Sequence, residues 1–74
     1  MAVQIVMDRT GDTRHQFDPS DSAATTLAAT RFQELLNRGF WAVALAPGGL
    51  PGRILRQFEP DVEQTLFIPH LQGG

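Results

Sequence analysis

The sequence predicts an α+β domain: a mixed sheet of four to five strands with one helix packed across it. Two observations support this class. A single segment over residues 18–39 has the apolar spacing of an amphipathic helix, and short apolar runs with the composition of strands lie on both sides of it. A helix with one apolar stripe needs another layer to cover it, and a single sheet is the economical cover. The 74 residues fit one domain.

The first element is a strand over residues 3–7. Alternation gives it one face of three apolar residues, Val3, Ile5 and Met7. Gln4 points to the other face, which we expect to be the outer one. Gly11 allows a turn, and a short polar strand over residues 13–17 then completes a hairpin. The polarity of this second strand suits an edge of the sheet.

The helix is expected to begin at Asp18, whose carboxylate can accept hydrogen bonds from the first-turn N–H groups. Pro19 suits the first helical position, and Asp21 would place a negative charge in the first turn. Gly39 suits the left-handed conformation that ends a helix. The expected buried stripe recurs at helical spacing, at Ala24, Leu27, Ala28, Phe32, Leu35 and Leu36. Four polar residues fall largely on the solvent side, Arg31, Glu34, Asn37 and Arg38.

Residues 40–45, Phe-Trp-Ala-Val-Ala-Leu, are nearly all apolar and predict a buried strand. Residues 47–52 consist mainly of proline and glycine, which predicts a loop. Residues 53–58 predict a strand that returns antiparallel to the previous one. Ile54 and Leu55 interrupt its alternation, so we expect a bulge or an edge position.

Residues 60–64 predict one short helical turn, and residues 65–68 predict the last strand. Pro69 ends that strand because it has no N–H for a ladder. The first and last strands are more apolar than the second, so we expect them to be neighbours at the centre of the sheet. The domain then spans residues 1–69, and residues 70–74 are expected to form a flexible tail.

Composition limits the classes of function. The six basic and eight acidic residues give a formal net charge of −2 without a basic cluster, which argues against nucleic acid as a partner. The absence of cysteine removes disulfides and thiolate chemistry, and no apolar run reaches the roughly 20 residues of a membrane span. We therefore expect a cytoplasmic monomer that binds neither nucleic acid nor membrane.

Residues suited to catalysis are sparse. His15 and His70 have no serine or carboxylate at a diagnostic spacing, and the scattered acidic residues do not make a zinc or calcium site. The segment at residues 48–52 is rich in glycine but lacks the Lys-Ser/Thr ending of a phosphate-binding loop, so we interpret it as a hairpin connection. We expect no catalytic residues, no metal and no cofactor, and hence no enzymatic activity.

Phe40 and Trp41 are adjacent, so in a strand they face opposite sides of the sheet. One of them must belong to the core, and the other can be exposed. Three large apolar residues are candidates for an exposed contact patch on the sheet, Trp41, Leu50 and Phe58. The alternative is that these side chains are needed for the core of so small a domain.

The last residues are Leu71-Gln72-Gly73-Gly74, and two glycines at a chain end would occur by chance in about one chain in 200. Diglycine has no side chains, so it can enter a narrow catalytic cleft with its carboxylate foremost. ATP can adenylate such a carboxylate, which can then pass to a thiol or an amine or become a thiocarboxylate. The alternative is a disordered end without function. All six basic residues are arginine, which reflects either GC-rich coding or selection against an acceptor amine.

In the order of its elements and in the ending Gly73-Gly74, nearly the whole chain resembles the β-grasp, ubiquitin-like family. This family includes ubiquitin, the sulfur carriers of thiamine and molybdopterin synthesis, bacterial ubiquitin-like proteins encoded beside activating and metalloprotease-like enzymes, and domains of phage tail-assembly proteins. The resemblance implies that Gly74 carries the activated carboxylate and that Gly73 lets it enter the enzyme. It also implies that the enzyme that binds the tail recognises Leu71 and Gln72. Gln72 is at the position where ubiquitin has arginine.

Two hypotheses about function follow from the resemblance and the tail. The first is a small bacterial ubiquitin-like protein whose Gly-Gly carboxylate is activated by a partner enzyme for conjugation or sulfur transfer. Its implied partners are an adenylating enzyme and a metalloprotease-like processing enzyme. The alternative is a non-covalent protein-interaction or assembly module of a phage or mobile element, which binds through its sheet face. Both stay open because a shared fold is a weak warrant for a shared activity.

Overall fold

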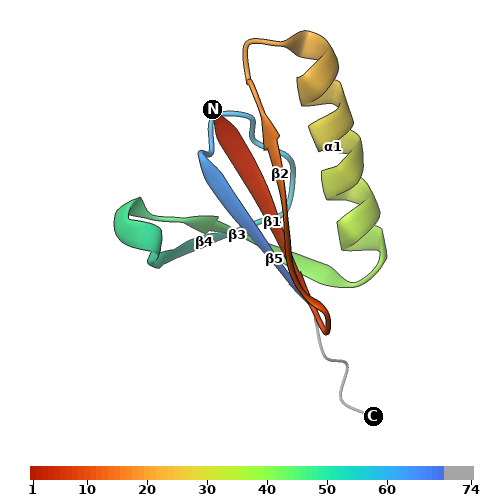
Figure 1. Cartoon of the computed structure of the whole chain (residues 1–74), viewed down its shortest axis with the longest axis vertical. Helices are drawn as coiled ribbons and strands as arrows, with labels where there is room; N and C mark the ends of the chain where they lie inside the picture. The colour runs from red at the N-terminus through yellow and green to blue at the C-terminus, as the bar shows by residue number, and fades with distance from the viewer. Residues whose placement is uncertain (70–74) are drawn as a thin grey trace.

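Five strands and one long helix make up the structure, a computed structural model that describes residues 1–69. The predicted flexible tail, residues 70–74, lies outside the described residues. Figure 1 shows the helix on one side of the sheet. In chain order the elements are β1 (Ala2–Asp8), β2 (Gly11–Phe17), α1 (Ser22–Asn37), β3 (Phe40–Leu45), a 3-10 turn (Pro47–Gly49), β4 (Pro51–Leu55) and β5 (Gln64–Pro69).

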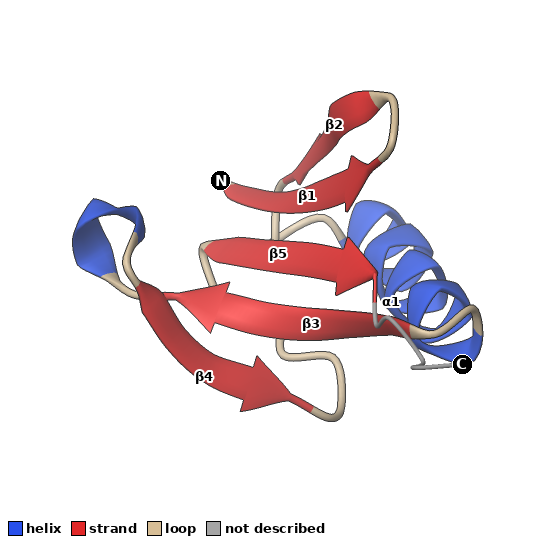
Figure 2. Cartoon of the chain, turned by 90° about the horizontal axis from the view of Figure 1, so that it is seen from below, coloured by secondary structure: helices blue, strands red, loops and turns tan. Residues whose placement is uncertain are grey.

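The strands form one mixed sheet in the order β2-β1-β5-β3-β4 (Figure 2). β1 and β5 pair in parallel, with Val3 opposite Gln64 and Val6 opposite Phe67, and the other neighbouring pairs are antiparallel. The predicted fold class is confirmed, because one helix packs across a five-stranded mixed sheet in a β-grasp-like layout. The expectation that the first and last strands are neighbours inside the sheet is confirmed as well.

The helix begins later than predicted. Asp21 is its N-cap, and the Asp21 carboxylate accepts hydrogen bonds from the N–H groups of Ala23 and Ala24 at 3.0 and 3.1 Å. Asp18 instead accepts hydrogen bonds from the N–H and hydroxyl of Ser20, and its own carbonyl accepts one from Asp21 N–H. The prediction was wrong because both aspartates suit capping, and the tight turn at Asp18 uses the first of them.

The buried face of the helix is narrower than predicted. Ala28, Phe32 and Leu35 are buried, whereas Leu27 is 64% exposed. Leu27 lies beside a groove that separates α1 from β2, so no strand covers it. The end of the helix agrees with prediction, because Gly39 has φ +93° and closes the last turn.

Two core clusters lie between the helix and the sheet. Phe58 packs against both clusters, with its ring centroid 5.9 Å from Phe32 and 6.1 Å from Phe17. Phe32 also meets Phe67 edge to face at 5.7 Å. The buried members of the larger cluster are Phe32, Leu35, Ala42, Ala44, Leu55 and Phe67, and those of the smaller are Ala2, Phe17 and Ala28. A loop residue, Phe58, therefore joins the two halves of the core.

The hairpin of β3 and β4 differs from prediction in its boundaries. β4 ends at Leu55, so the strand predicted over residues 53–58 is too long at its C-terminal end. β4 also begins earlier than predicted, within the loop expected over residues 47–52. There, a Cβ on Gly52 would collide with the carbonyl oxygen of Ala44. Glycine thus permits the close approach that extends the pairing. The predicted edge position is confirmed, and the pairing is irregular after Ala44.

Gln4 lies on the helix side of β1, so the prediction that it faces outward is wrong. Gln4 is 1% exposed, and both the nitrogen and the oxygen of its amide are hydrogen-bonded. Gln4 Nε2 donates to the carbonyl oxygen of Ala28 at 3.0 Å, and Gln4 Oε1 accepts from Arg31 Nη1 at 2.9 Å. Arg31 is accordingly half-buried rather than on the solvent side. The alternation of β1 places Val3, Ile5 and Met7 on the opposite face of the sheet.

Candidate functional site

The face of the sheet opposite α1 carries several exposed apolar side chains. Ala42 and Phe67 are a cross-strand pair in the core beneath the helix, so the alternate residues of β3 and β5 point the other way. Among these, Trp41 pairs with Ile68, and Val43 pairs with Ile54 of β4. We call this surface, made by Trp41, Val43, Ile54, Leu66 and Ile68 with Val3, Ile5 and Met7 of β1, the open sheet face.

Several large side chains of the open sheet face are exposed. Trp41 is 43% exposed, Ile54 52% and Ile68 37%. Large apolar side chains gathered on one surface are typical of a site that binds another molecule. Strand alternation could have identified Ile54 and Ile68. Each is adjacent in sequence to a core residue, Leu55 or Phe67, and therefore points to the opposite face of the sheet. The sequence alone does not establish this, because adjacent apolar residues are equally typical of a bulge or of a buried strand.

The three residues predicted as a contact patch do not form one surface. Trp41 belongs to the open sheet face. Leu50 is 65% exposed but lies at the far end of the hairpin, next to Pro51, which pairs with Leu45. Phe58 packs in the core on the helix side, as described above. The structure therefore places only Trp41 of this set beside other exposed apolar side chains of the sheet.

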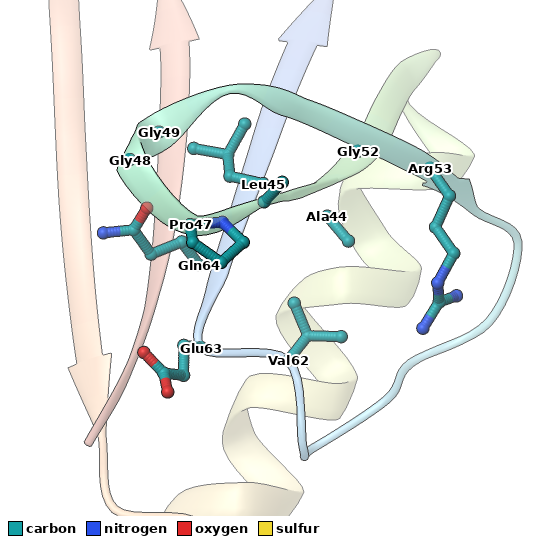
Figure 3. Close-up of a pocket in the computed structure, with 11 residues that line it drawn as sticks. Ala44, Leu45, Pro47, Gly48, Gly49, Gly52, Arg53, Val62, Glu63 and Gln64 are labelled. Carbon is teal, nitrogen blue, oxygen red and sulfur yellow. The ribbon is translucent and has the colours of Figure 1, made fainter.

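A hollow of about 1010 Å³ lies beneath the glycine-rich turn of the hairpin (Figure 3). Gly48 and Gly49 have φ values of +82° and +78°, which glycine adopts without strain. Figure 3 shows Arg53 on one side of the hollow and Glu63 on the other. The carboxylate of Glu59 binds Arg53 through two hydrogen bonds of 2.8 and 2.6 Å.

The pairing of Arg53 with Glu59 lowers the pKa of the Glu59 carboxyl and raises the pKa of the Arg53 guanidinium, in both cases chiefly through the hydrogen bonds between them. The charge of Arg53 is therefore already matched within the chain. The described residues that line the hollow include no pairing of a nucleophile with a base, and its glycines allow the chain to turn. This agrees with the interpretation of residues 48–52 as a hairpin connection.

His15 lies in the groove between α1 and β2 and is half-buried. Burial lowers the pKa of the His15 imidazole, and the nearby charge of Arg31 lowers it further. In the same groove, hydrogen bonds from the hydroxyl and N–H of Thr10 lower the pKa of Asp8. Within residues 1–69 no three His, Asp or Glu side chains gather in a way that could hold a metal ion.

The residues predicted for C-terminal activation, Gly73 and Gly74, lie outside the described residues. So do the predicted recognition residues, Leu71 and Gln72, and the second histidine, His70. The described chain ends at Pro69, which pairs with Phe40 of β3. Because β5 lies between β1 and β3, the segment that follows starts from the interior of the sheet rather than from an edge.

Comparison with known proteins adds no relative: no protein-family model, no curated protein and no solved structure matches this chain. Among the described residues, no helix has both the length and the apolar character needed to cross a membrane. The fold and the surface together define a small α+β domain of β-grasp-like layout that exposes one apolar face of its sheet.

Proposed function

We propose that this chain is a small ubiquitin-like carrier whose Gly74 carboxyl group is activated by a partner enzyme. The observation that carries the proposal is the position of β5. An interior strand leads directly into the segment that contains Gly73 and Gly74. The β-grasp-like layout supports the same proposal, because the resemblance stated above rests on this order of elements and on this ending.

The chemistry of the proposal needs only a free Gly74 carboxylate, either at the end of the chain or released there by a processing protease. The carboxylate attacks the α-phosphate of ATP, which forms an acyl adenylate and releases pyrophosphate. A thiol, an amine or a sulfide donor then attacks the acyl carbon and releases AMP. The five residues beyond Pro69 can extend by about 17 Å, which is enough to enter a partner's active site while the folded body stays outside.

The test is mass spectrometry of an N-terminally tagged copy recovered from its native host. An amide bond between Gly74 and a partner amine would establish a modifier, and a terminal oxygen-to-sulfur exchange would establish a sulfur carrier. Deletion of Gly73 and Gly74 should remove either product and leave the far-UV circular dichroism spectrum unchanged. Only unmodified protein, under conditions in which the gene is active, would count against the proposal.

A second candidate function is a non-covalent interaction or assembly module, and the open sheet face favours it. The exposed side chains of Trp41, Ile54 and Ile68 would gain free energy by contact with a partner, at about 25 cal/mol per Å² of apolar area removed from water. Ile54→Asp should abolish capture of partners from native extract. Leu50→Asp is the matched control, because Leu50 is even more exposed but lies away from this face.

A further inference from the structure

A smaller hollow lies where β4 stops short of β3. β3 begins at Phe40, but its pairing with β4 begins only at Ala42, opposite Leu55. β4 therefore does not extend alongside Phe40 and Trp41. The space there forms a hollow of about 380 Å³. We call it the β3–β4 hollow, and its main lining residues are Leu36, Phe40, Trp41, Ile54 and Arg56.

The walls of the β3–β4 hollow are mainly apolar. Trp41 and Ile54 come from the open sheet face, whereas Leu36 and Phe40 are partly buried against the larger core cluster. The hollow is therefore continuous with the open sheet face and bends around the end of β4. Tryptophan and arginine are the residue types that most often dominate the energy of protein interfaces.

Among the described residues, Arg56 supplies the only charged side chain that lines this hollow. Arg56 is exposed at its lip, and no carboxylate is among the residues that line it. The carboxylate of Glu59, three residues after Arg56 in the sequence, is bound by Arg53. The exposed guanidinium of Arg56 therefore favours a partner that brings a carboxylate.

We propose that the β3–β4 hollow docks a segment of another protein that presents a large apolar side chain beside an aspartate or glutamate. The apolar side chain lies between Trp41 and Ile54, and the carboxylate pairs with Arg56. This inference rests on the second candidate function, non-covalent binding through the sheet, and names the chemistry of its partner. It does not depend on the fate of Gly74.

Fluorescence can test the proposal directly, because Trp41 is the only tryptophan in the chain. The full chain is titrated at low ionic strength with the blocked peptide acetyl-Asp-Glu-Leu-Phe-Asp-Glu-amide. A second titration uses the matched peptide in which lysines replace the acidic residues. We expect a saturable blue shift with the acidic peptide alone, which weakens as salt is added because Arg56 is exposed to solvent.

Two charge reversals isolate the role of Arg56. Arg56→Glu should weaken binding of the acidic peptide by about tenfold or more. Arg9→Glu is the control, because Arg9 is also an exposed arginine but lies in the turn between β1 and β2, and it should leave the affinity unchanged. Equal losses in both variants would mean that net charge, and not the hollow, determines binding, and the proposal would be overturned.

Other results would also overturn the proposal. A shift of equal size with the lysine peptide, or no shift at millimolar peptide, would exclude the proposed chemistry. Binding that appears only after deletion of residues 70–74 would identify the chain's own end as the occupant. A concentration-dependent dimer that Arg56→Glu dissociates would identify a second copy. If Ile54→Asp abolishes partner capture while the acidic peptide does not bind, this inference fails and the second candidate function stands.

Discussion

Gln4 and Arg31, which are far apart in sequence, are joined by a hydrogen bond of 2.9 Å between Gln4 Oε1 and Arg31 Nη1. The same amide group also donates to the carbonyl oxygen of Ala28. A buried amide on an interior strand is costly unless its donor and acceptor are satisfied, and here the helix satisfies both. These bonds fix where α1 lies along β1, because a shift of the helix by one turn would break them.

Replacing Gln4 with alanine should therefore destabilise the fold by about 2 kcal/mol, because the variant loses both hydrogen bonds and leaves a cavity. Urea denaturation followed by circular dichroism gives the free energy of unfolding. Gln33→Ala is the control, since Gln33 is an exposed glutamine whose amide bonds only to Asn37 on the helix surface. If both variants unfold at the same urea concentration, the Gln4 bonds contribute nothing to stability.

The position of the helix cap can be tested with two aspartates. Asp21→Ala should lower the free energy of unfolding by about 1 kcal/mol, because two N–H groups of the first turn lose their acceptor. Asp18→Ala should have a smaller effect, since Asp18 bonds only within the preceding turn. A larger effect at Asp18 than at Asp21 would show that the helix begins where the sequence first suggested.

Neighbouring residues of β5 should differ sharply in their contribution to stability. Phe67 is fully buried against Phe32, so Phe67→Ala should cost about 3–5 kcal/mol, enough to unfold most of so small a domain. Ile68 lies on the open sheet face, and Ile68→Ala should cost about 1 kcal/mol or less. Thermal unfolding of both variants would check the assignment of the two faces, and similar losses would contradict it.

Stability should depend on pH through His15. Its folded-state pKa lies below the ordinary value of 6.5, so the neutral imidazole is favoured in the folded state. The unfolded chain therefore takes up the proton first, and stability falls as pH is lowered through about 6.5. The midpoint of thermal unfolding between pH 8 and pH 5 should fall in the native chain and fall less in His15→Gln. Equal slopes would mean that His15 titrates alike in both states.

The carboxylates should act in a separate pH window. The pKa values of Asp8, Asp18 and Glu59 are lowered by their hydrogen bonds, so the stability that these groups add is present above their ordinary range and is lost only as pH falls through the lowered values. A series confined to pH 5–8 thus lies above the window in which these three carboxylates act. His70 is present in both the native protein and the His15→Gln variant, so the difference between their pH profiles reports on His15.

The sequence was sufficient for the class and order of elements, because hydrophobic spacing and turn residues mark them strongly. Gly39 and the turn at Gly11 are conformational signals of this kind, and the structure has both at positive φ. The sequence was insufficient for the orientation of β1, because Val3, Ile5 and Val6 make both faces of this strand apolar. With no other criterion, a polar residue such as Gln4 is expected on the solvent side. Only the partners on α1, distant in sequence, explain why Gln4 points inward.

The candidate site was predicted less well than the fold for the same reason. Trp41 is exposed as the contact hypothesis required, but its neighbours Ile54 and Ile68 are set by cross-strand register, which no local pattern encodes. Phe58 is needed for the core, which is the alternative stated for these side chains, because the loop that carries it folds back under the helix. The role of Gly73 and Gly74 stays a prediction.

The parallel pairing of β1 with β5 has a consequence for how the molecule is made. Val3 lies opposite Gln64, so the interior of the sheet cannot close until almost the whole chain has been synthesised. During synthesis on the ribosome, the first hairpin and α1 therefore lack a complete sheet, and Phe32 stays uncovered until β5 has emerged. A truncation inside β5 should therefore yield an aggregation-prone fragment, whereas trimming beyond Pro69 should leave a domain that still folds.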